Sequence, residues 1–388
     1  MKKKYIILSI ITLVLLITFV TSFNYFKTSN NYVEDSVNNQ TKITKGISMN
    51  LEQTAGAGDY KQVTQSSWPT EGYKFNAELS RCENGSTLSW DDTKKAIVIS
   101  GNLSDKCYVY FDIFSQISLV KYVISQYTGT QGESGIYYHN SSLANGAGDN
   151  SYRYAGASDS VNNYICLGSD ESSCPDANLF RIIGVFGDKT KVIRAKSTGA
   201  RSWSSNGDNM WSTASMNTYL NGTYLTSLGT LADKIATTTW KVGGGSWANI
   251  GTSVPKTAYQ YEVGSNSRPK TYEAKIGLMY VTDYYYGASS SAWTLVGYNS
   301  SDATKDYRAA TSINWLYLGS DEWTISRTLD YSGTVFAVMS GRLYNYDAGM
   351  GRYEVRPTFN LESSVTYISG IGTMSDPIRI NWLTDSFE

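Results

Sequence analysis

The first 26 residues combine positive charge with a long apolar run. Three lysines at positions 2–4 precede an uncharged segment, 5–26, whose most apolar part is 6–20. The run is close to the roughly 20 residues that span a bilayer, and positive flanks stay in the cytoplasm. We therefore predict a transmembrane helix in 1–26 that anchors a single-pass protein in the cell membrane, with its bulk extracellular. The alternative is a signal peptide cleaved near 20–22, which would leave the chain secreted.

The pattern of apolar and polar residues changes twice between residues 27 and 112. Segment 27–45 is polar and has too little apolar surface to fold alone, so we predict a flexible stalk. In 46–112, short segments of alternating apolar and polar residues are separated by turn residues, which is typical of strands with one buried face. These segments are Ile47–Leu51, Tyr73–Leu79, Ala96–Ser100 and Cys107–Phe111. The pattern predicts a small all-β module that loosely resembles an immunoglobulin-like sandwich.

Helical spacing first appears at the start of 113–388, which we predict to be a second domain. Its first apolar positions are Ile113, Ile117, Val120 and Ile124. They fit one face of a helix over 113–127. A further helix is predicted over 212–228. The predicted strands are Leu179–Phe186, Lys191–Ala195, Ala274–Val281, Thr334–Met339, Tyr353–Leu361, Val365–Ile368 and Ile378–Asn381. Few helices among many short strands indicate an α+β domain.

Composition narrows the class of partner. The 388 residues include 33 Lys and Arg against 34 Asp and Glu, so the net charge is −1. This balance gives no electrostatic reason to bind nucleic acid. The 31 tyrosines have two explanations, the codon bias of an AT-rich gene or a surface built for adaptable contacts, because Tyr, Ser, Gly and Asn dominate binding loops. Composition leaves both open.

The four cysteines, Cys82, Cys107, Cys166 and Cys174, are widely spaced and contain no C-x-x-C motif. They therefore do not indicate a zinc or redox site. In an exported chain, two disulfides are expected. Three pairings are possible for four cysteines, and our hypothesis joins nearest neighbours, Cys82 with Cys107 and Cys166 with Cys174.

Motifs for catalysis or cofactor binding are absent from the sequence. The single histidine, His139, lies in a Tyr-Tyr-His-Asn segment without a nucleophile elbow, and we interpret it as a loop residue. Carboxylates gather over 149–176, but their spacing matches no calcium loop, so solvated turn residues are the preferred interpretation. We therefore predict no catalytic residue, no metal, no cofactor and no enzymatic activity.

Two short motifs near the C-terminus carry a resemblance. They are Trp323-Thr-Ile-Ser326 and Val355-Arg356-Pro357, separated by a stretch rich in Ser, Asn, Tyr and Gly. This arrangement resembles an uncharacterised bacterial extracellular domain family and is similar to the Fibrobacter succinogenes major paralogous domain. The resemblance covers about 178–380. It implies a C-type-lectin-like fold, related in layout to formylglycine-generating-enzyme domains.

The resemblance implies architecture without a ligand, because the chain departs from its relatives at their functional motifs. The catalytic cysteines of formylglycine-generating enzymes have no counterpart in the C-terminal region, and the signatures of calcium-dependent sugar binding are absent. Arg356 lies within an apolar strand, so we expect it to need a structural ion pair or carbonyl contacts. We predict core positions for Trp211, Trp315 and Trp323.

The stretch between the two motifs is the candidate binding face. It mixes tyrosines with small polar residues and four glycines between segments that we predict to be core strands. Its candidate ligand-binding residues are Arg327, Asp330, Tyr331, Arg342, Tyr344, Asn345, Tyr346, Asp347, Arg352 and Tyr353. Tyr offers a large contact area at low entropic cost, and Arg is enriched among binding hot spots. The alternative is an irregular surface loop.

These patterns together predict a surface-displayed binding or adhesion protein that recognises an unknown protein or glycan on another cell or in the envelope. A glycan-directed envelope enzyme on a lectin-like scaffold is one alternative. A purely structural envelope protein is another. An enzyme would need a pocket with converging carboxylates and shifted pKa values. A binding protein would need an exposed face of aromatic and polar side chains.

Overall fold

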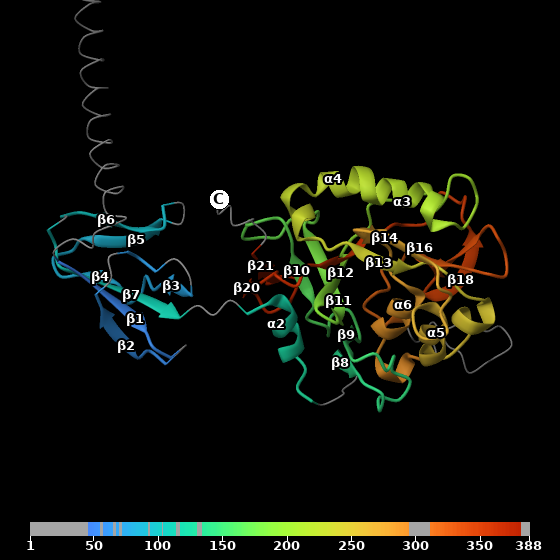
Figure 1. Ribbon diagram of the computed structural model, residues 1–388, viewed down its shortest axis with the longest axis horizontal. Helices are drawn as coiled ribbons and strands as arrows, with labels where there is room; N and C mark the ends of the chain where they lie inside the picture. The colour runs from blue at the N-terminus through green and yellow to red at the C-terminus, as the bar shows by residue number, and fades with distance from the viewer. Residues whose placement is uncertain are drawn as a thin grey trace, which may run out of the picture. The chain divides into compact units, whose positions relative to one another are not determined.

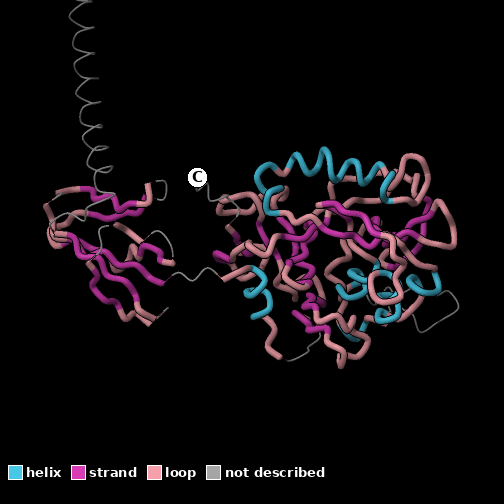
Figure 2. The backbone as a smooth tube through the Cα atoms, in the orientation of Figure 1, coloured by secondary structure: helices cyan, strands magenta, loops and turns pink. Residues whose placement is uncertain are grey.

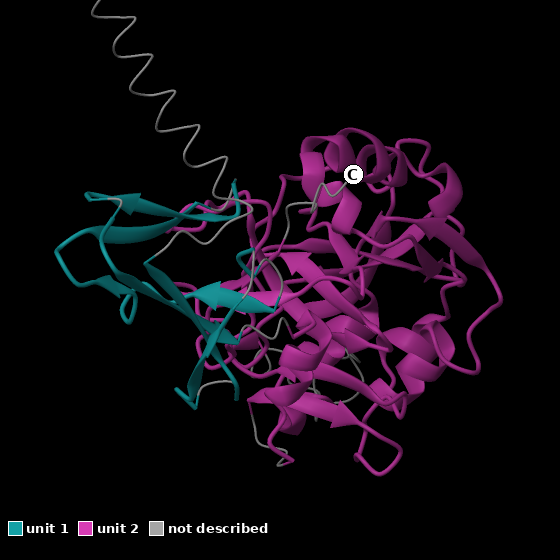
Figure 3. Cartoon of the chain, turned by 60° about the vertical axis from the view of Figure 1, so that its left-hand side comes forward, with its two compact units in different colours: residues 1–116 teal, residues 117–388 magenta. Residues whose placement is uncertain are grey.

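The computed structural model describes nine stretches of the chain, and the remaining residues lie outside the description. These stretches are 46–54, 57–64, 67–69, 72–91, 94–102, 104–113, 117–129, 134–294 and 311–381. The chain divides into two compact units, Met1–Gln116 and Ile117–Glu388 (Figure 3). The division falls four residues after the predicted boundary at 112/113 because strand β7, Cys107–Ile113, continues beyond Phe111.

Unit 1 is built from short strands around a small apolar core. Its strands are β1 Ile47–Glu52, β2 Tyr60–Val63, β3 Tyr73–Phe75, β4 Arg81–Cys82, β5 Thr87–Asp91, β6 Ala96–Ser100 and β7 Cys107–Ile113. The main sheet has the order β2-β1-β7-β3, and β4 also pairs with β7. β1 and β7 run parallel, whereas β5 and β6 form a separate antiparallel hairpin. Phe111 lies at the centre of the core, where Trp68, Phe75 and Trp90 contact it.

Unit 2 contains a large sheet with two smaller ones. The strands of its nine-stranded sheet are β8 Gly135–His139, β9 Ser151–Ala155, β10 Tyr164–Cys166, β11 Leu179–Phe186, β12 Lys189–Arg194, β15 Ile276–Gly277, β19 Thr358–Leu361, β20 Tyr367–Ser369 and β21 Ile378–Ile380. The main order is β15-β19-β12-β11-β10-β21-β20, and β9 joins β8 to β11. The smaller sheets are β13 Thr238–Lys241 with β14 Thr271–Ala274, and β16 Glu322–Arg327 with β17 Thr334–Met339 and β18 Arg342–Asp347.

The helices of unit 2 include α3 and α4, which run along one edge of the unit (Figures 1 and 2). The α-helices are α2 Leu119–Ser125, α3 Ser215–Tyr219, α4 Leu225–Ser227, α5 Pro255–Glu262 and α6 Val281–Gly287. The 3₁₀ helices are Trp211–Thr213, Gly229–Lys234 and Ser290–Ala292, and the π-helical turns are Leu220–Tyr224 and Trp247–Gly251. The helix predicted over 212–228 is largely confirmed, because α3, the π-helical turn Leu220–Tyr224 and α4 follow one another without a break from Ser215 to Ser227.

The predicted α+β class of the second domain is wrong for the described chain. The structure is mostly sheet, with 35% strand against 17% helix. Apart from the run Ser215–Ser227, the described α-helices of unit 2 are no longer than α5. Ala274–Val281, predicted as one strand, is divided. β14 ends at Ala274, β15 covers two residues, and α6 begins at Val281.

The predicted membrane anchor, 1–26, and the predicted stalk, 27–45, lie outside the described residues. Within the described part, no helix has the length and apolar character needed to cross a membrane.

Both predicted disulfides are confirmed. Cys82 is bonded to Cys107 across the paired strands β4 and β7 of unit 1. Cys166, at the end of β10, is bonded to Cys174 in the loop before β11 of unit 2. Each bond closes a loop within one unit, as the nearest-neighbour hypothesis requires.

The core of unit 2 also confirms the structural roles predicted for Arg356 and three tryptophans. The Arg356 side chain is fully buried, and its Nε donates to Glu322 Oε1 at 2.7 Å. Its Nη2 donates to the carbonyl of Leu316 at 2.6 Å. The buried tryptophans are Trp211, Trp315 and Trp323. His139 departs from its prediction as a loop residue, because it lies in β8 with its ring against Tyr286 and Trp293.

Candidate functional site

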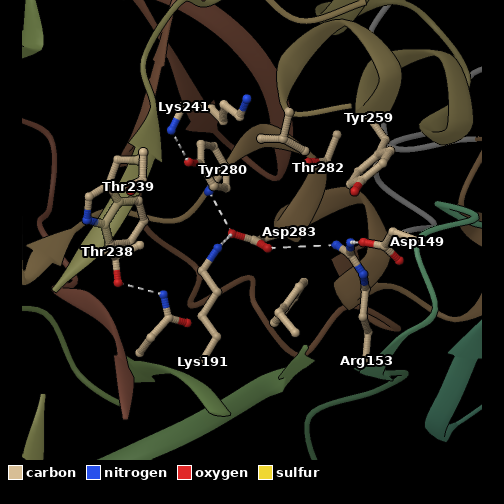
Figure 4. A pocket seen from close by; sticks show the side chains of 14 residues that line it. Asp149, Arg153, Lys191, Thr238, Thr239, Lys241, Tyr259, Tyr280, Thr282 and Asp283 are labelled. Atoms are coloured by element: carbon tan, nitrogen blue, oxygen red, sulfur yellow. Dashed lines mark hydrogen bonds and ion pairs between the residues drawn. The ribbon is translucent and has the colours of Figure 1, made fainter. Parts of the chain in front are cut away.

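Unit 2 contains a pocket of about 200 Å³ in which charged and aromatic side chains converge (Figure 4). Strands β9, β11 and β12 supply one side, strands β13 and β19 another, and helices α5 and α6 the rest. The residues that line it are Asp149, Arg153, Phe186, Lys191, Thr238, Thr239, Trp240, Lys241, Tyr259, Val263, Tyr280, Thr282, Asp283 and Asn360. None of these residues belongs to the predicted binding face.

Asp283 is at the centre of the pocket because of its place in helix α6. It is the third residue of the helix, and its Oδ2 accepts from the backbone N of Tyr280 at 2.8 Å in a capping box. The same oxygen binds the Lys191 ammonium at 2.5 Å. Lys191 reaches it from β12, where the neighbouring residues Thr190 and Val192 are buried. The carboxylate therefore caps a helix and neutralises a buried lysine at once.

Arg153 approaches Asp283 from the opposite side (Figure 4). Its Nη1 lies 4.0 Å from Asp283 Oδ1, and its Nη2 binds Asp149 Oδ2 at 2.7 Å. Its Nε donates to Ser151 Oγ at 2.8 Å. The guanidinium carbon also lies 4.6 Å from the ring centroid of Phe186, a cation–π distance. Hydrogen bonds and aromatic contacts thus hold Arg153 in one orientation.

The pKa shifts in the pocket follow from burial and from this pairing. Burial acts to raise the pKa of Asp149, but the Arg153 charge and hydrogen bonds from Ser151 outweigh it and hold that pKa below its ordinary value. Burial lowers the pKa of the Lys191 amino group, and the Asp283 carboxylate opposes this shift. Burial raises the pKa of the Tyr280 hydroxyl, which accepts from the backbone N of Lys241.

The two central cations and two carboxylates balance one another. Arg153 and Lys191 each contact a carboxylate, so these four charges cancel. Lys241 is a third cation of the lining. Trp240 and Tyr280 add apolar surface, while Thr238 and Asn360 hydrogen-bond to each other at 3.0 Å.

Sequence reasoning missed this pocket because its residues are far apart in the chain. Asp149 had been interpreted as a solvated turn residue, and Asp283 had no assigned role. One signal for the pocket was available, namely a cationic residue within a strand in which its neighbours are buried. Arg153 in β9 and Lys191 in β12 are such residues. A buried cation requires a nearby carboxylate, but the pattern does not say which one.

The predicted binding face is divided between strand β18 and the loops beside it. β18 pairs only with β17 and lies at the end of its sheet. Because side chains alternate along a strand, Arg342, Tyr344 and Tyr346 lie on one face. The Arg342 guanidinium lies 5.2 Å from the centroid of the Tyr344 ring. All three side chains are half-buried.

Arg352 extends this row. Its Nη2 donates to the Tyr346 hydroxyl at 2.7 Å, and its guanidinium lies 4.9 Å from the Tyr346 ring centroid. Arg342, Tyr344, Tyr346 and Arg352 are called the β18 stripe below. Tyr353 does not belong to it, which corrects its assignment to the ligand-binding residues. Its side chain is fully buried, with its ring centroid 4.5 Å from that of Trp323.

The other predicted residues are not part of the stripe. Arg327 is half-buried and donates to the carbonyl of Gly243 at 3.1 Å. The Asp330 carboxylate accepts from the backbone N of Trp247. Tyr331 is 64% exposed, and Asp347 accepts from the backbone N of Gly349 at 2.8 Å. Asn345 is half-buried on the opposite face of β18 from the stripe.

Comparison of the chain with protein-family models, with curated proteins and with solved structures gives no match. The resemblance inferred from the tryptophan and Val-Arg-Pro motifs therefore stays a prediction. Functional inference depends on the side chains of the two sites described above.

Proposed function

We propose that this chain is a surface-displayed binding or adhesion protein that recognises an extracellular protein through the β18 stripe. The observation that carries the proposal is the row formed by Arg342, Tyr344 and Tyr346 on one face of β18 and extended by Arg352 from the loop that follows. Both residue types are enriched among binding hot spots, and each ring here is already held by contacts within the chain. A ligand would therefore meet an ordered surface, which reduces the entropic cost of binding.

The arrangement favours a protein ligand over a glycan. Each tyrosine of the stripe has a guanidinium over its ring and a second aromatic ring nearby, Trp247 for Tyr344 and Tyr353 for Tyr346. Sugar stacking would need a more open ring face. The stripe instead offers hydroxyl and guanidinium groups, which suit the carboxylates and carbonyls of a protein surface.

The pKa directions of the carboxyl groups in and near the pocket favour binding over general-acid catalysis as the function of unit 2. A general acid at neutral pH needs a carboxyl with a raised pKa that a substrate can reach. The pKa of Asp149 is lowered. Burial raises the pKa of Glu262, but its carboxylate accepts hydrogen bonds from Ser326 and Thr282 and does not line the pocket.

Display at the cell surface rests on the sequence of 1–26 and on the disulfides. Two disulfides with no free cysteine among the described residues are typical of a protein that works in an oxidising compartment. Anchoring by 1–26, or secretion after cleavage, remains part of the proposal.

The proposal is tested by screening the full chain against arrays of extracellular proteins and glycans and then changing the stripe. The double variant Tyr344→Ala/Tyr346→Ala should weaken binding of a captured protein by about 2 kcal/mol or more, roughly 30-fold. The variant Tyr344→Phe/Tyr346→Phe retains the ring packing and should lose less. Tyr138→Ala is the matched control, because Tyr138 stacks on Tyr152 in β9, outside the stripe.

Circular dichroism and the melting temperature show whether each variant remains folded. If the folded double variant binds its protein ligand as tightly as the unaltered chain, the stripe is not the binding surface. If the arrays capture only glycans, the assignment to a protein ligand is wrong.

A further inference from the structure

A second cavity of unit 2, separate from the pocket of Figure 4 and from the β18 stripe, has a volume of about 510 Å³. It lies between the ends of β11 and β12 and the helical segment that runs from α3 through α4 (elements labelled in Figure 1). Phe180 and Leu231 supply apolar surface, while Arg194 and Tyr224 supply polar groups. This volume is within the range of small-molecule sites in proteins.

The Tyr224 side chain lacks a hydrogen-bond partner for its hydroxyl. The residue is 7% exposed, and its buried hydroxyl oxygen is one of the few unpaired polar atoms among the described side chains. Burial raises the pKa of this hydroxyl, so it stays protonated and remains a donor at neutral pH. An unpaired buried donor costs free energy that a hydrogen-bond acceptor would recover.

Arg194 is the second unpaired group of the cavity. Its Nε is buried without a partner, and its side chain makes one long hydrogen bond within the described residues, 3.5 Å from Nη1 to the carbonyl of Ser197. No carboxylate of the described chain forms an ion pair with it. It is also the only charged residue among the described residues that line the cavity. Its charge lies near enough to Tyr224 to oppose the rise in that residue's pKa.

Three other polar side chains that line the cavity already have partners. Asn178 Nδ2 donates to the carbonyl of Leu167 at 2.7 Å, and Ser227 Oγ donates to the carbonyl of Tyr224 at 2.7 Å. Thr198 Oγ1 donates to the carbonyl of Val355 at 3.2 Å. Among the buried polar side-chain atoms of the lining, those without a partner are therefore on Arg194 and Tyr224.

We propose that this cavity binds a small carboxylate, with Arg194 as the cation and Tyr224 as a neutral donor to the same anion. A planar guanidinium fork matches the two oxygens of a carboxylate, and a phenolic hydroxyl adds a third hydrogen bond. One cation balances one negative charge, which favours a carboxylate over a phosphate dianion. The mainly polar lining suits a hydrophilic molecule the size of an amino acid or a sugar acid.

Ligand access requires a small movement. Arg194 Nε and the Tyr224 hydroxyl lie beneath the surface, whereas the Arg194 residue as a whole is half-buried. A turn of its flexible side chain would bring the guanidinium fork to the ligand, at a cost recovered by pairing the charge.

The test measures the melting temperature of the full chain with acetate, glutamate or glucuronate, followed by calorimetric titration of any ligand that stabilises it. At least one carboxylate should raise the melting temperature in a concentration-dependent way, because it binds only the folded state. Glucose serves as the neutral counterpart of glucuronate and should have no effect. Inorganic phosphate should bind more weakly than the carboxylate.

Two substitutions in the cavity and one control identify the site. Arg194→Gln and Tyr224→Phe should each weaken carboxylate binding by about tenfold or more. Without ligand, Tyr224→Phe should leave the melting temperature unchanged or higher, because it removes an unpaired hydroxyl. Arg81→Gln, in unit 1, should leave binding unchanged.

Failure of all three carboxylates to bind, or tighter binding of phosphate, would overturn the proposal. Equal binding by the folded Arg194→Gln variant would also overturn it. These outcomes are independent of protein capture by the β18 stripe, which Arg194→Gln leaves intact.

Discussion

The pocket centred on Asp283 and the β18 stripe use cations beside aromatic rings in opposite ways. In the pocket, Arg153 and Lys191 are buried and each contacts a carboxylate. In the stripe, Arg352 is exposed and lies against Tyr346, with no ion pair in the described chain. A buried charge needs a counter-charge for the fold to be stable, whereas an arginine exposed to water remains available to a ligand.

The largest change in stability should come from removing the carboxylate at the centre of the pocket. Asp283→Asn leaves Lys191 buried without a counter-charge, so we expect the free energy of unfolding to fall by about 3–5 kcal/mol. Urea denaturation monitored by tryptophan fluorescence measures the change. Adding Lys191→Met to the same variant should recover much of the loss. A change below about 1 kcal/mol for Asp283→Asn would show that Lys191 is solvated or uncharged.

A smaller loss of stability should distinguish Tyr353, the buried neighbour of the stripe, from the residues of the stripe itself. Tyr353→Ala removes a ring packed against Trp323, and we expect a loss of about 3 kcal/mol. Tyr344→Ala should cost less, because that side chain is half-buried. Thermal unfolding of the two variants compares them directly. Equal losses would mean that the stripe is as much a part of the core as Tyr353.

Acidification should reduce the contribution that the Asp149 carboxylate makes to the free energy of unfolding. The folded-state pKa of this carboxyl is lowered, so its contribution to stability is present above its unfolded pKa of about 3.9 and is lost as the pH falls below that value. Asp149→Asn should cost about 2 kcal/mol at neutral pH and progressively less below pH of about 4. Urea denaturation of both proteins at several pH values tests this. A pH-independent difference would contradict the assignment.

The smallest effect is expected at the exposed end of the stripe. Arg352→Ala should change the free energy of unfolding by less than about 1 kcal/mol, because an exposed cation–π contact contributes little. The same variant should weaken capture of the protein ligand. Chemical denaturation and binding are measured on one preparation. A large loss of stability with unchanged binding would reverse the contrast between the two regions.

Local pattern predicted some elements to the residue. Leu179–Phe186 coincides with β11, Thr334–Met339 with β17 and Ala96–Ser100 with β6. These segments are continuous apolar runs or clear alternations bounded by turns, so local information suffices. Prediction failed in 274–281, where β14 ends at Ala274, β15 covers only two residues and α6 begins at Val281. It also extended β19 to Tyr353, although the strand begins at Thr358.

The candidate sites were predictable to different extents. The stripe lies within one short segment, so its residue types were visible together, and the alternation along β18 then selected Arg342, Tyr344 and Tyr346. The pocket joins Asp149, Lys191 and Asp283, which are far apart in the chain. Only the pairing of β9 and β12 with β11, and the cap of α6, bring their side chains within bonding distance.

By itself, the sequence determined the strands with strong local patterns and the need of Arg356 for a buried partner, and it favoured the nearest-neighbour disulfides that the structure confirms. Each of these depends on neighbours in the chain or on the general cost of burying a charge. The tertiary structure alone decided that the partner is Glu322, that Tyr353 is core while Tyr346 is surface, and that Arg194 and Tyr224 share a cavity. Contacts between distant segments are selected by the packing of the whole unit, which no local pattern encodes.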